Sequence, residues 1–186
     1  MLYKKIVISD DLWQIIRNEM TMFAISKIQS LDKPTIIQNA ISIPRDQFIM
    51  NVPSFNQFLD QYELKINNLW LSVTKRIGPH LDFSEDSTDY DDYQNKPRTR
   101  SLATNWPIFN TENSSTIFYT PRPDHRFIKK GLLGFNENDL DIIDQFTLES
   151  PTVMRADVIH SVKVLNDLPR ISYSIRYTSE PTILFK

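Results

Sequence analysis

The chain has 186 residues, 40% hydrophobic and 24% charged, with a formal net charge of −2, which fits one soluble domain spanning 1–186 with a sizeable core. It contains no cysteine, which excludes disulfides, zinc–thiolate sites, iron–sulfur clusters and cysteine nucleophiles. Its three glycines are too few for a glycine-rich phosphate-binding loop, which excludes P-loop and dinucleotide-binding folds.

The first third of the chain predicts a short strand and two helices. Residues 3–8 alternate weakly between apolar and polar side chains and predict the strand. Asp10 or Asp11 can cap a first helix. Its apolar positions recur at intervals of three and four, which predicts one buried face. The helix carries Leu12, Ile15, Ile16, Glu19, Met22, Phe23, Ile25 and Ile28. Ser54 can cap a second helix that contains Phe55, Phe58, Leu59, Tyr62, Leu64 and Ile66.

From residue 69 onward the pattern changes to short β-rich segments bounded by turn residues. The predicted strands are 69–73, 101–108, 115–119, 140–148, 152–157, 160–165 and 170–178. Strands in series without intervening helices predict a mainly β fold with N-terminal helices, arranged as an antiparallel sandwich or barrel. The segment 84–97 is rich in Asp, Glu, Ser and Asn and predicts an exposed acidic loop, with a calcium site as the alternative.

His80-Leu81-Asp82 is the sharpest candidate for a functional site. In an extended segment, residues two apart point to the same side, so this imidazole and this carboxylate can bind one ion. A second histidine from a distant strand would complete a set of two His and one carboxylate, which leaves positions open on an octahedral ion, as in non-haem Fe(II) oxygenases. His160 follows a strand-like segment and is the better third ligand, whereas His125 lies in a turn-rich stretch where a solvated histidine is expected.

A second candidate site begins ten residues after His160. The segment 170–177 alternates, so Arg170, Ser172, Ser174 and Arg176 share one face of a predicted strand. The planar guanidinium of Arg170 suits a carboxylate, and the Ser172 hydroxyl can add a hydrogen bond. The alternative for the two arginines is the polar outer face of an edge strand.

The ordered set His80-x-Asp82, His160 and Arg170-x-Ser172 resembles the signature of the Fe(II)/2-oxoglutarate-dependent dioxygenase superfamily, in particular its small phage- and bacteria-type members. The resemblance covers about 69–178. It implies a double-stranded β-helix, a jelly-roll and cupin-like barrel, with 1–68 as N-terminal support and 179–186 as a C-terminal extension.

The resemblance also implies an activity and its cofactors. His80, Asp82 and His160 would hold Fe(II), and 2-oxoglutarate and O2 would be cosubstrates. Arg170, assisted by Ser172, would bind the 5-carboxylate of 2-oxoglutarate. The chain would then be a hydroxylase that forms succinate and CO2 as its substrate is oxidised.

Three further residues are weaker candidates for the same pocket. Asn105 could donate to the cosubstrate if its strand face points inward, and its alternative is a hydrogen bond to backbone at a strand end. Tyr119 could contact the cosubstrate and Trp106 the substrate, whereas the alternative for both is a place in the barrel core. Two other functions stay open: a cupin-like metal enzyme that does not use 2-oxoglutarate, against which Arg170-x-Ser172 argues, and a non-catalytic β-barrel binding protein.

The expected substrate is a peptide, an amino acid or another small molecule. Charges of both signs are spread along the chain, which argues against a nucleic-acid partner, because such proteins usually carry a clustered basic surface. No run approaches the roughly 18 apolar residues of a membrane span, and acid interrupts the N-terminal segment too early for a secretory signal. A cytoplasmic location without membrane attachment is therefore expected.

Overall fold

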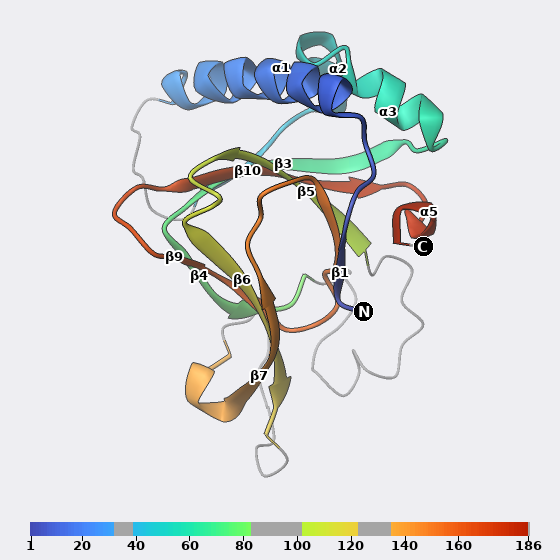
Figure 1. Ribbon diagram of the computed structural model, residues 1–186. Helices are drawn as coiled ribbons and strands as arrows, with labels where there is room; N and C mark the ends of the chain where they lie inside the picture. The colour runs from blue at the N-terminus through green and yellow to red at the C-terminus, as the bar shows by residue number, and fades with distance from the viewer. Residues whose placement is uncertain (32–38, 83–101, 123–134, 186) are drawn as a thin grey trace.

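The computed structural model describes residues 1–31, 39–82, 102–122 and 135–185, which form two antiparallel β-sheets with helices on one side (Figure 1). The larger sheet contains, in order, β1 (Tyr3–Lys5), β8 (Thr152–Arg155), β5 (Leu102–Phe109), β10 (Arg170–Tyr177), β3 (Ile66–Thr74) and β2 (Asn39–Ser42). The smaller sheet contains β4 (Arg76–His80), β9 (His160–Val164), β6 (Ser114–Pro121) and β7 (Leu140–Phe146). The predicted mainly β, antiparallel fold with N-terminal helices is confirmed.

The helices cover the outer face of the larger sheet (Figure 1). They are α1 (Asp10–Gln29), α2 (Arg45–Asn51) and α3 (Phe55–Gln61), while η1 (Glu137–Asp139) precedes β7 and α5 (Thr182–Phe185) lies near the C-terminus. The main core lies between these helices and the sheet, and its large side chains include Trp13, Met20, Phe48, Phe55, Phe58, Trp106 and Tyr173. None of the described helices has the length and apolar sequence that a membrane crossing needs.

The first helix was predicted correctly, but its cap and part of its buried face were not. The Ser9 hydroxyl, rather than Asp10 or Asp11, accepts a hydrogen bond from the Leu12 amide at 3.4 Å. The buried residues are Trp13, Ile16, Met20, Phe23 and Ala24, whereas Ile15, Met22 and Ile25 are exposed. The apolar residues of α1 occupy more than one face, and the helix buries the side that carries its large aromatic rings.

The second predicted helix, α3, is shorter than expected. It ends at Gln61, and Glu63 adopts φ 52°, in the left-handed region, where the chain turns towards β3. The predicted members Leu64 and Ile66 therefore lie outside the helix. Ser54 makes no side-chain cap. Its backbone N–H and its hydroxyl instead donate to the Glu19 carboxylate of α1, at 3.0 and 2.8 Å.

Strand β10 shows why the larger sheet has one apolar and one polar face. Tyr173, Ile175 and Tyr177 belong to the core beneath the helices, whereas Arg170, Ser172, Ser174 and Arg176 face the other way, as the alternation predicts. Strand β10 pairs with β3 on one side and β5 on the other, so the alternative of an edge strand is wrong. The polar face is turned towards the smaller sheet, because Arg170 reaches Thr116 of β6 and Arg176 reaches Asp82 after β4.

Candidate metal centre and carboxylate pocket

His80, Asp82 and His160 meet where β4 and β9 pair in the smaller sheet. The two histidines lie opposite each other in the strand register, and their ring centroids are 4.4 Å apart. Asp82 lies two residues after the end of β4, and its backbone N–H donates to the Ala156 carbonyl at 3.2 Å. One ligand atom from each of the three side chains lies within 4.8 Å of the others, so the three residues can hold one metal ion.

The backbone fixes which ring nitrogen of each histidine faces the carboxylate. Nδ1 of His80 lies 2.9 Å from the Gly78 carbonyl oxygen, and Nδ1 of His160 lies 2.8 Å from that of Val158. A carbonyl only accepts hydrogen bonds, so in neutral rings Nδ1 carries the proton and Nε2 keeps a free lone pair. Metal-binding histidines commonly use this arrangement, with the non-ligating N–H donated to a fixed acceptor.

The spacing of the three ligand atoms suits a divalent ion. Nε2 of His80 lies 3.6 Å from Asp82 Oδ1, and Nε2 of His160 lies 3.7 Å from Oδ2. Neighbouring ligand atoms around an octahedral ion bound at about 2.1 Å are roughly 3 Å apart, so a small inward movement would complete the coordination. Two other sequence candidates, His125 and the acidic segment 84–97, lie outside the described residues.

Arg176 is a member of this site that the sequence interpretation missed. Its Nη2 atom lies 2.7 Å from Asp82 Oδ2, and its side chain is 11% exposed. Burial alone would raise the pKa of Asp82, but charge on His160 and Arg176 outweighs it and holds that pKa below its ordinary value. The alternation of β10 was the available signal, because it places Arg176 on the face of Arg170.

His160 is held in its neutral form. Burial, reinforced by the nearby charge of His80, lowers its pKa from 6.5 to about 4. A neutral imidazole is the form that binds a metal, so His160 is prepared for ligation across the physiological pH range.

Acidification of the metal-free protein from pH 7 to pH 5 is expected to lower its free energy of unfolding by about 2 kcal/mol through His160 alone. Over this interval the unfolded chain takes up a proton at pKa 6.5, whereas folded His160, at about 4, does not. Urea unfolding at the two pH values measures the loss. His160→Gln, which does not titrate, should lose most of this dependence, and an unchanged dependence in the variant would contradict the assignment.

Arg170 lies in a second buried site, between the sheets. The residue is 4% exposed, and among the described residues its guanidinium has a single hydrogen bond, from Nη1 to Thr116 Oγ1 at 3.2 Å, and no carboxylate partner. Burial lowers its pKa to about 10. Its register neighbour Thr74 has a buried hydroxyl that finds no hydrogen-bond partner in the part of the chain that the structure describes. A buried cation beside an unsatisfied hydroxyl is a site suited to an anion.

The remaining candidates divide between two faces of the sheets. Ser172 is buried on the face of Arg170, and Asn105 lies opposite Ser174 of β10, so both belong to the polar interior. Trp106 is fully buried on the other face of β5, where it packs against aromatic rings of α1 and α3. Tyr119 belongs to a separate apolar cluster, and its hydroxyl lies 2.9 Å from that of Ser161. Trp106 therefore occupies a place in the core, which was its alternative.

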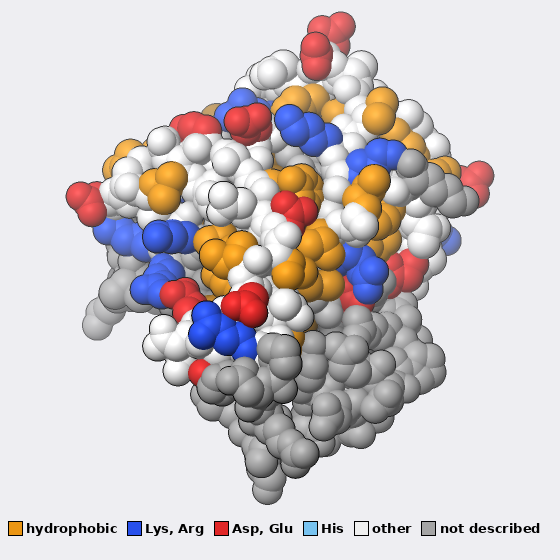
Figure 2. All heavy atoms as spheres, turned by 60° about the horizontal axis from the view of Figure 1, so that its bottom comes forward, with side chains coloured by type: hydrophobic (Ala, Val, Ile, Leu, Met, Phe, Trp, Pro, Cys, Tyr) orange, Lys and Arg blue, Asp and Glu red, His pale blue; other side chains and the backbone are white. Residues whose placement is uncertain are grey.

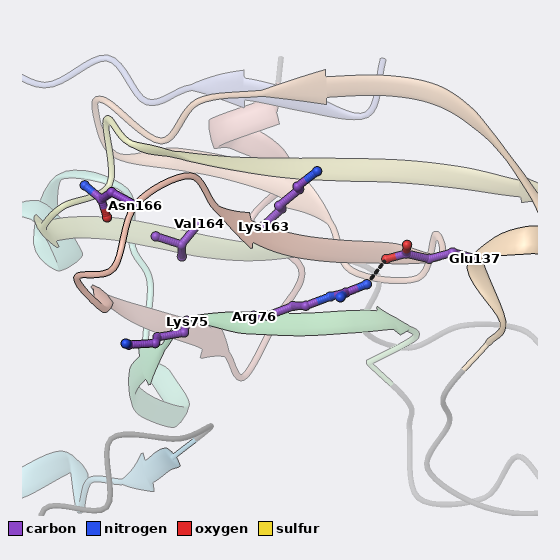
Figure 3. Close-up of a pocket in the computed structure, with 6 residues that line it drawn as sticks. All are labelled: Lys75, Arg76, Glu137, Lys163, Val164 and Asn166. Atoms are coloured by element: carbon purple, nitrogen blue, oxygen red, sulfur yellow. Dashed lines mark hydrogen bonds and ion pairs between the residues drawn. The ribbon is translucent and has the colours of Figure 1, made fainter.

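A separate cleft lies beside β4 and β9 (Figure 3). Its charged lining includes Lys75, Lys163 and an ion pair between Arg76 and Glu137 at 2.9 Å. In Figure 3 the two lysines point away from each other, so the cleft does not gather its charges around one point. His80, Asp82 and His160 are not among the residues that line it.

Solved structures that share this fold include α-ketoglutarate-dependent, that is 2-oxoglutarate-dependent, enzymes. The chain is similar to the epimerase SnoN, solved in complex with Fe3+, alpha ketoglutarate and nogalamycin RO, with a TM-score of 0.54 and 13% identity over 95% of this chain and 78% of that chain. It is also similar to the non-haem carbocyclase SnoK from nogalamycin biosynthesis, with a TM-score of 0.54 and 10% identity over 96% of this chain and 82% of that chain.

No protein-family model matches the sequence, and no curated protein matches it. At 10% and 13% identity, the two structural likenesses concern the fold. The predicted resemblance to Fe(II)/2-oxoglutarate-dependent enzymes is therefore confirmed for the fold, and the predicted metal ligands form a group that can hold an ion.

Proposed function

We propose that this protein is a non-haem Fe(II)- and 2-oxoglutarate-dependent oxygenase that hydroxylates a peptide, an amino acid or another small molecule. One observation carries the proposal: a group of two His and one carboxylate shares the interior with a buried arginine that has no acidic partner among the described residues. The metal group alone would fit many enzymes, and the arginine alone would fit many anions. A dicarboxylate that also ligates the metal accounts for both.

The strand order supports a double-stranded β-helix, the jelly-roll and cupin-like barrel. From β3 to β10 the strands alternate between the larger and the smaller sheet, apart from the β6–β7 hairpin. The last two strands return beside the first two, because β9 pairs with β4 and β10 pairs with β3. This return brings His160 next to His80, although 79 residues lie between them in the sequence.

His80, Asp82 and His160 would hold the Fe(II). Two neutral imidazoles and one carboxylate occupy one face of an octahedral ion and leave positions for 2-oxoglutarate and O2. When bound, the iron supplies O2 activation coupled to the oxidative decarboxylation of 2-oxoglutarate to succinate and CO2. Arg176 engages one oxygen of Asp82, which favours ligation through the other oxygen.

Arg170 would anchor the 5-carboxylate of 2-oxoglutarate, with Ser172, Thr116 and the unsatisfied Thr74 hydroxyl as additional donors. The spacing supports this role. Phe118 pairs with His160 across the two strands. Thr116, which Arg170 contacts, lies two residues before Phe118 in β6, a separation of about 7 Å along the strand. The terminal carbons of an extended five-carbon chain are about 5 Å apart, from four bonds of about 1.5 Å, and the carboxylate oxygens extend the reach.

The substrate would approach from the end of the interior that carries Asp82. There the side chains of Asp82 and His80 are 35% and 23% exposed, whereas Arg170 is 4% exposed. Asn105 lies on the same polar face and is a candidate for contact with the cosubstrate. On the surface drawn in Figure 2, basic and acidic side chains are interspersed around hydrophobic ones, which does not favour a nucleic acid as the partner.

Anaerobic addition of Fe(II) and then 2-oxoglutarate tests the proposal. A keto acid that chelates Fe(II) produces a visible charge-transfer absorption, whereas glutarate, which lacks the 2-oxo group, does not. We expect the absorption with 2-oxoglutarate only. Metal binding without a response to 2-oxoglutarate would instead support the cupin-like metal enzyme, and no binding of either would support the non-catalytic barrel.

A further inference from the structure

Asp157 is a buried carboxylate that has no part in the proposed reaction. It lies in the connection 156–159 between β8 and β9, and its side chain is 2% exposed. Arg155, the last residue of β8, donates to it twice, from Nε to Oδ1 at 2.6 Å and from Nη2 to Oδ2 at 2.5 Å. Two parallel hydrogen bonds of this kind fix both the distance and the orientation of the carboxylate relative to the end of the strand.

The same connection supports two of the proposed metal ligands through its backbone. The Ala156 carbonyl accepts the backbone N–H of Asp82 at 3.2 Å, and the Val158 carbonyl lies 2.8 Å from Nδ1 of His160. These two carbonyls belong to the residues on either side of Asp157. The path of the backbone through Asp157 therefore affects the position of both carbonyls.

The ion pair makes this conformation hard to change. Loss of Arg155 would remove two charge-assisted hydrogen bonds from a buried carboxylate, so we expect the connection to shift towards a conformation that hydrates Asp157. Any such rearrangement moves the carbonyls of Ala156 and Val158, because they flank the residue that moves.

We propose that Arg155 and Asp157 are positioning residues for the metal centre: their ion pair fixes the β8–β9 connection so that its carbonyls orient Asp82 and His160. This inference rests on the proposed function, since it requires that these two side chains bind a metal. Loss of a partner that orients a metal ligand typically weakens metal binding about 10- to 100-fold.

Co(II) titration of Asp157→Asn, followed by calorimetry and by the visible absorption of the bound Co(II), tests this role. The asparagine amide nitrogen is a donor, so it cannot accept the second hydrogen bond from Arg155. We therefore expect about 10- to 100-fold weaker Co(II) binding and an altered absorption spectrum. Arg155→Lys keeps the charge but loses the fork, and should give a smaller loss in the same direction. If Asp157→Asn does not fold, the Co(II) affinity and spectrum of Arg155→Lys test the positioning role.

Glu19→Ala is the matched control, because it removes two hydrogen bonds to Ser54 in the helical layer, away from the metal centre. It should lower thermal stability while leaving Co(II) affinity and spectrum as in the wild type. Wild-type affinity and spectrum in both Asp157→Asn and Arg155→Lys would overturn the positioning role alone. A wild-type protein that binds no Co(II) would refute the proposed function and this inference with it.

Discussion

Replacement of Arg170 by methionine is expected to abolish 2-oxoglutarate binding and to raise the thermal stability of the ligand-free protein. Hydrogen bonds to a charged group contribute about 1.5–3 kcal/mol each, so loss of a two-pronged anchor should weaken binding by more than about 100-fold. The buried guanidinium has no acidic partner among the described residues, and methionine fills similar space without a charge to desolvate. We expect the free energy of unfolding of the ligand-free protein to rise by about 1–3 kcal/mol. Each kcal/mol raises Tm by about 2–4 °C in a chain of this length.

Two other cations provide the controls for Arg170→Met. Arg176→Met should destabilise the protein, because it leaves the Asp82 carboxylate without its ion-pair partner. Lys163→Met, on an exposed side chain of β9, should change neither stability nor binding appreciably. Calorimetric titration and thermal unfolding of the three variants would measure both effects. An Arg170→Met protein that binds 2-oxoglutarate normally would show that the guanidinium is not the anchor. One that loses stability as Arg176→Met does would show that the guanidinium stabilises the fold.

Separate replacement of each histidine by alanine is expected to divide the three residues into two ligands and one bystander. His80→Ala and His160→Ala each remove an imidazole that faces Asp82, and should weaken Mn(II) or Fe(II) binding by more than roughly 100-fold, the upper end of the loss caused by supporting residues. His125→Ala, outside the described residues, should bind metal as the wild type does. Anaerobic calorimetry with circular dichroism as a check of folding makes the comparison.

The histidine variants also distinguish one shared ion from two unrelated sites. If both ligands hold one ion, the double variant His80→Ala/His160→Ala should bind little more weakly than either single variant, because the first change already destroys the site. Metal binding that survives His160→Ala, or that is lost in His125→Ala, would contradict the assignment of the triad.

Much of the fold could be predicted from the sequence, because the patterns that indicate strands and turns are local. The alternation of residues 170–177 predicted both faces of β10, because every second side chain of a strand points to the same side of the sheet. The boundaries of β5 to β10 lie within two residues of the predicted ones, because turn residues mark their ends. The α1 pattern was ambiguous, because its apolar residues exceed what one helical face can bury, and packing on the sheet selected the face.

The candidate metal ligands could be proposed from the sequence for a chemical reason, whereas the groups that support them could not. Two His and one carboxylate are a recognisable donor set, and His80-x-Asp82 supplies two of the three within one extended segment. The contact of Arg170 with Thr116 joins residues 54 apart, and it depends on how two strands in different sheets face each other. The carbonyls of Gly78 and Val158 leave no trace in the sequence, because any residue can supply a backbone oxygen.

Titration of 2-oxoglutarate into the protein under anaerobic conditions, once with Mn(II) bound and once without metal, shows most directly whether the two sites act together. If the metal centre and the Arg170 pocket form one site, binding should be strong only with metal present, and both His160→Ala and Arg170→Met should remove it. Binding that is equally strong without metal would contradict a shared site, and the absence of binding to metal-loaded wild-type protein would contradict the proposed function.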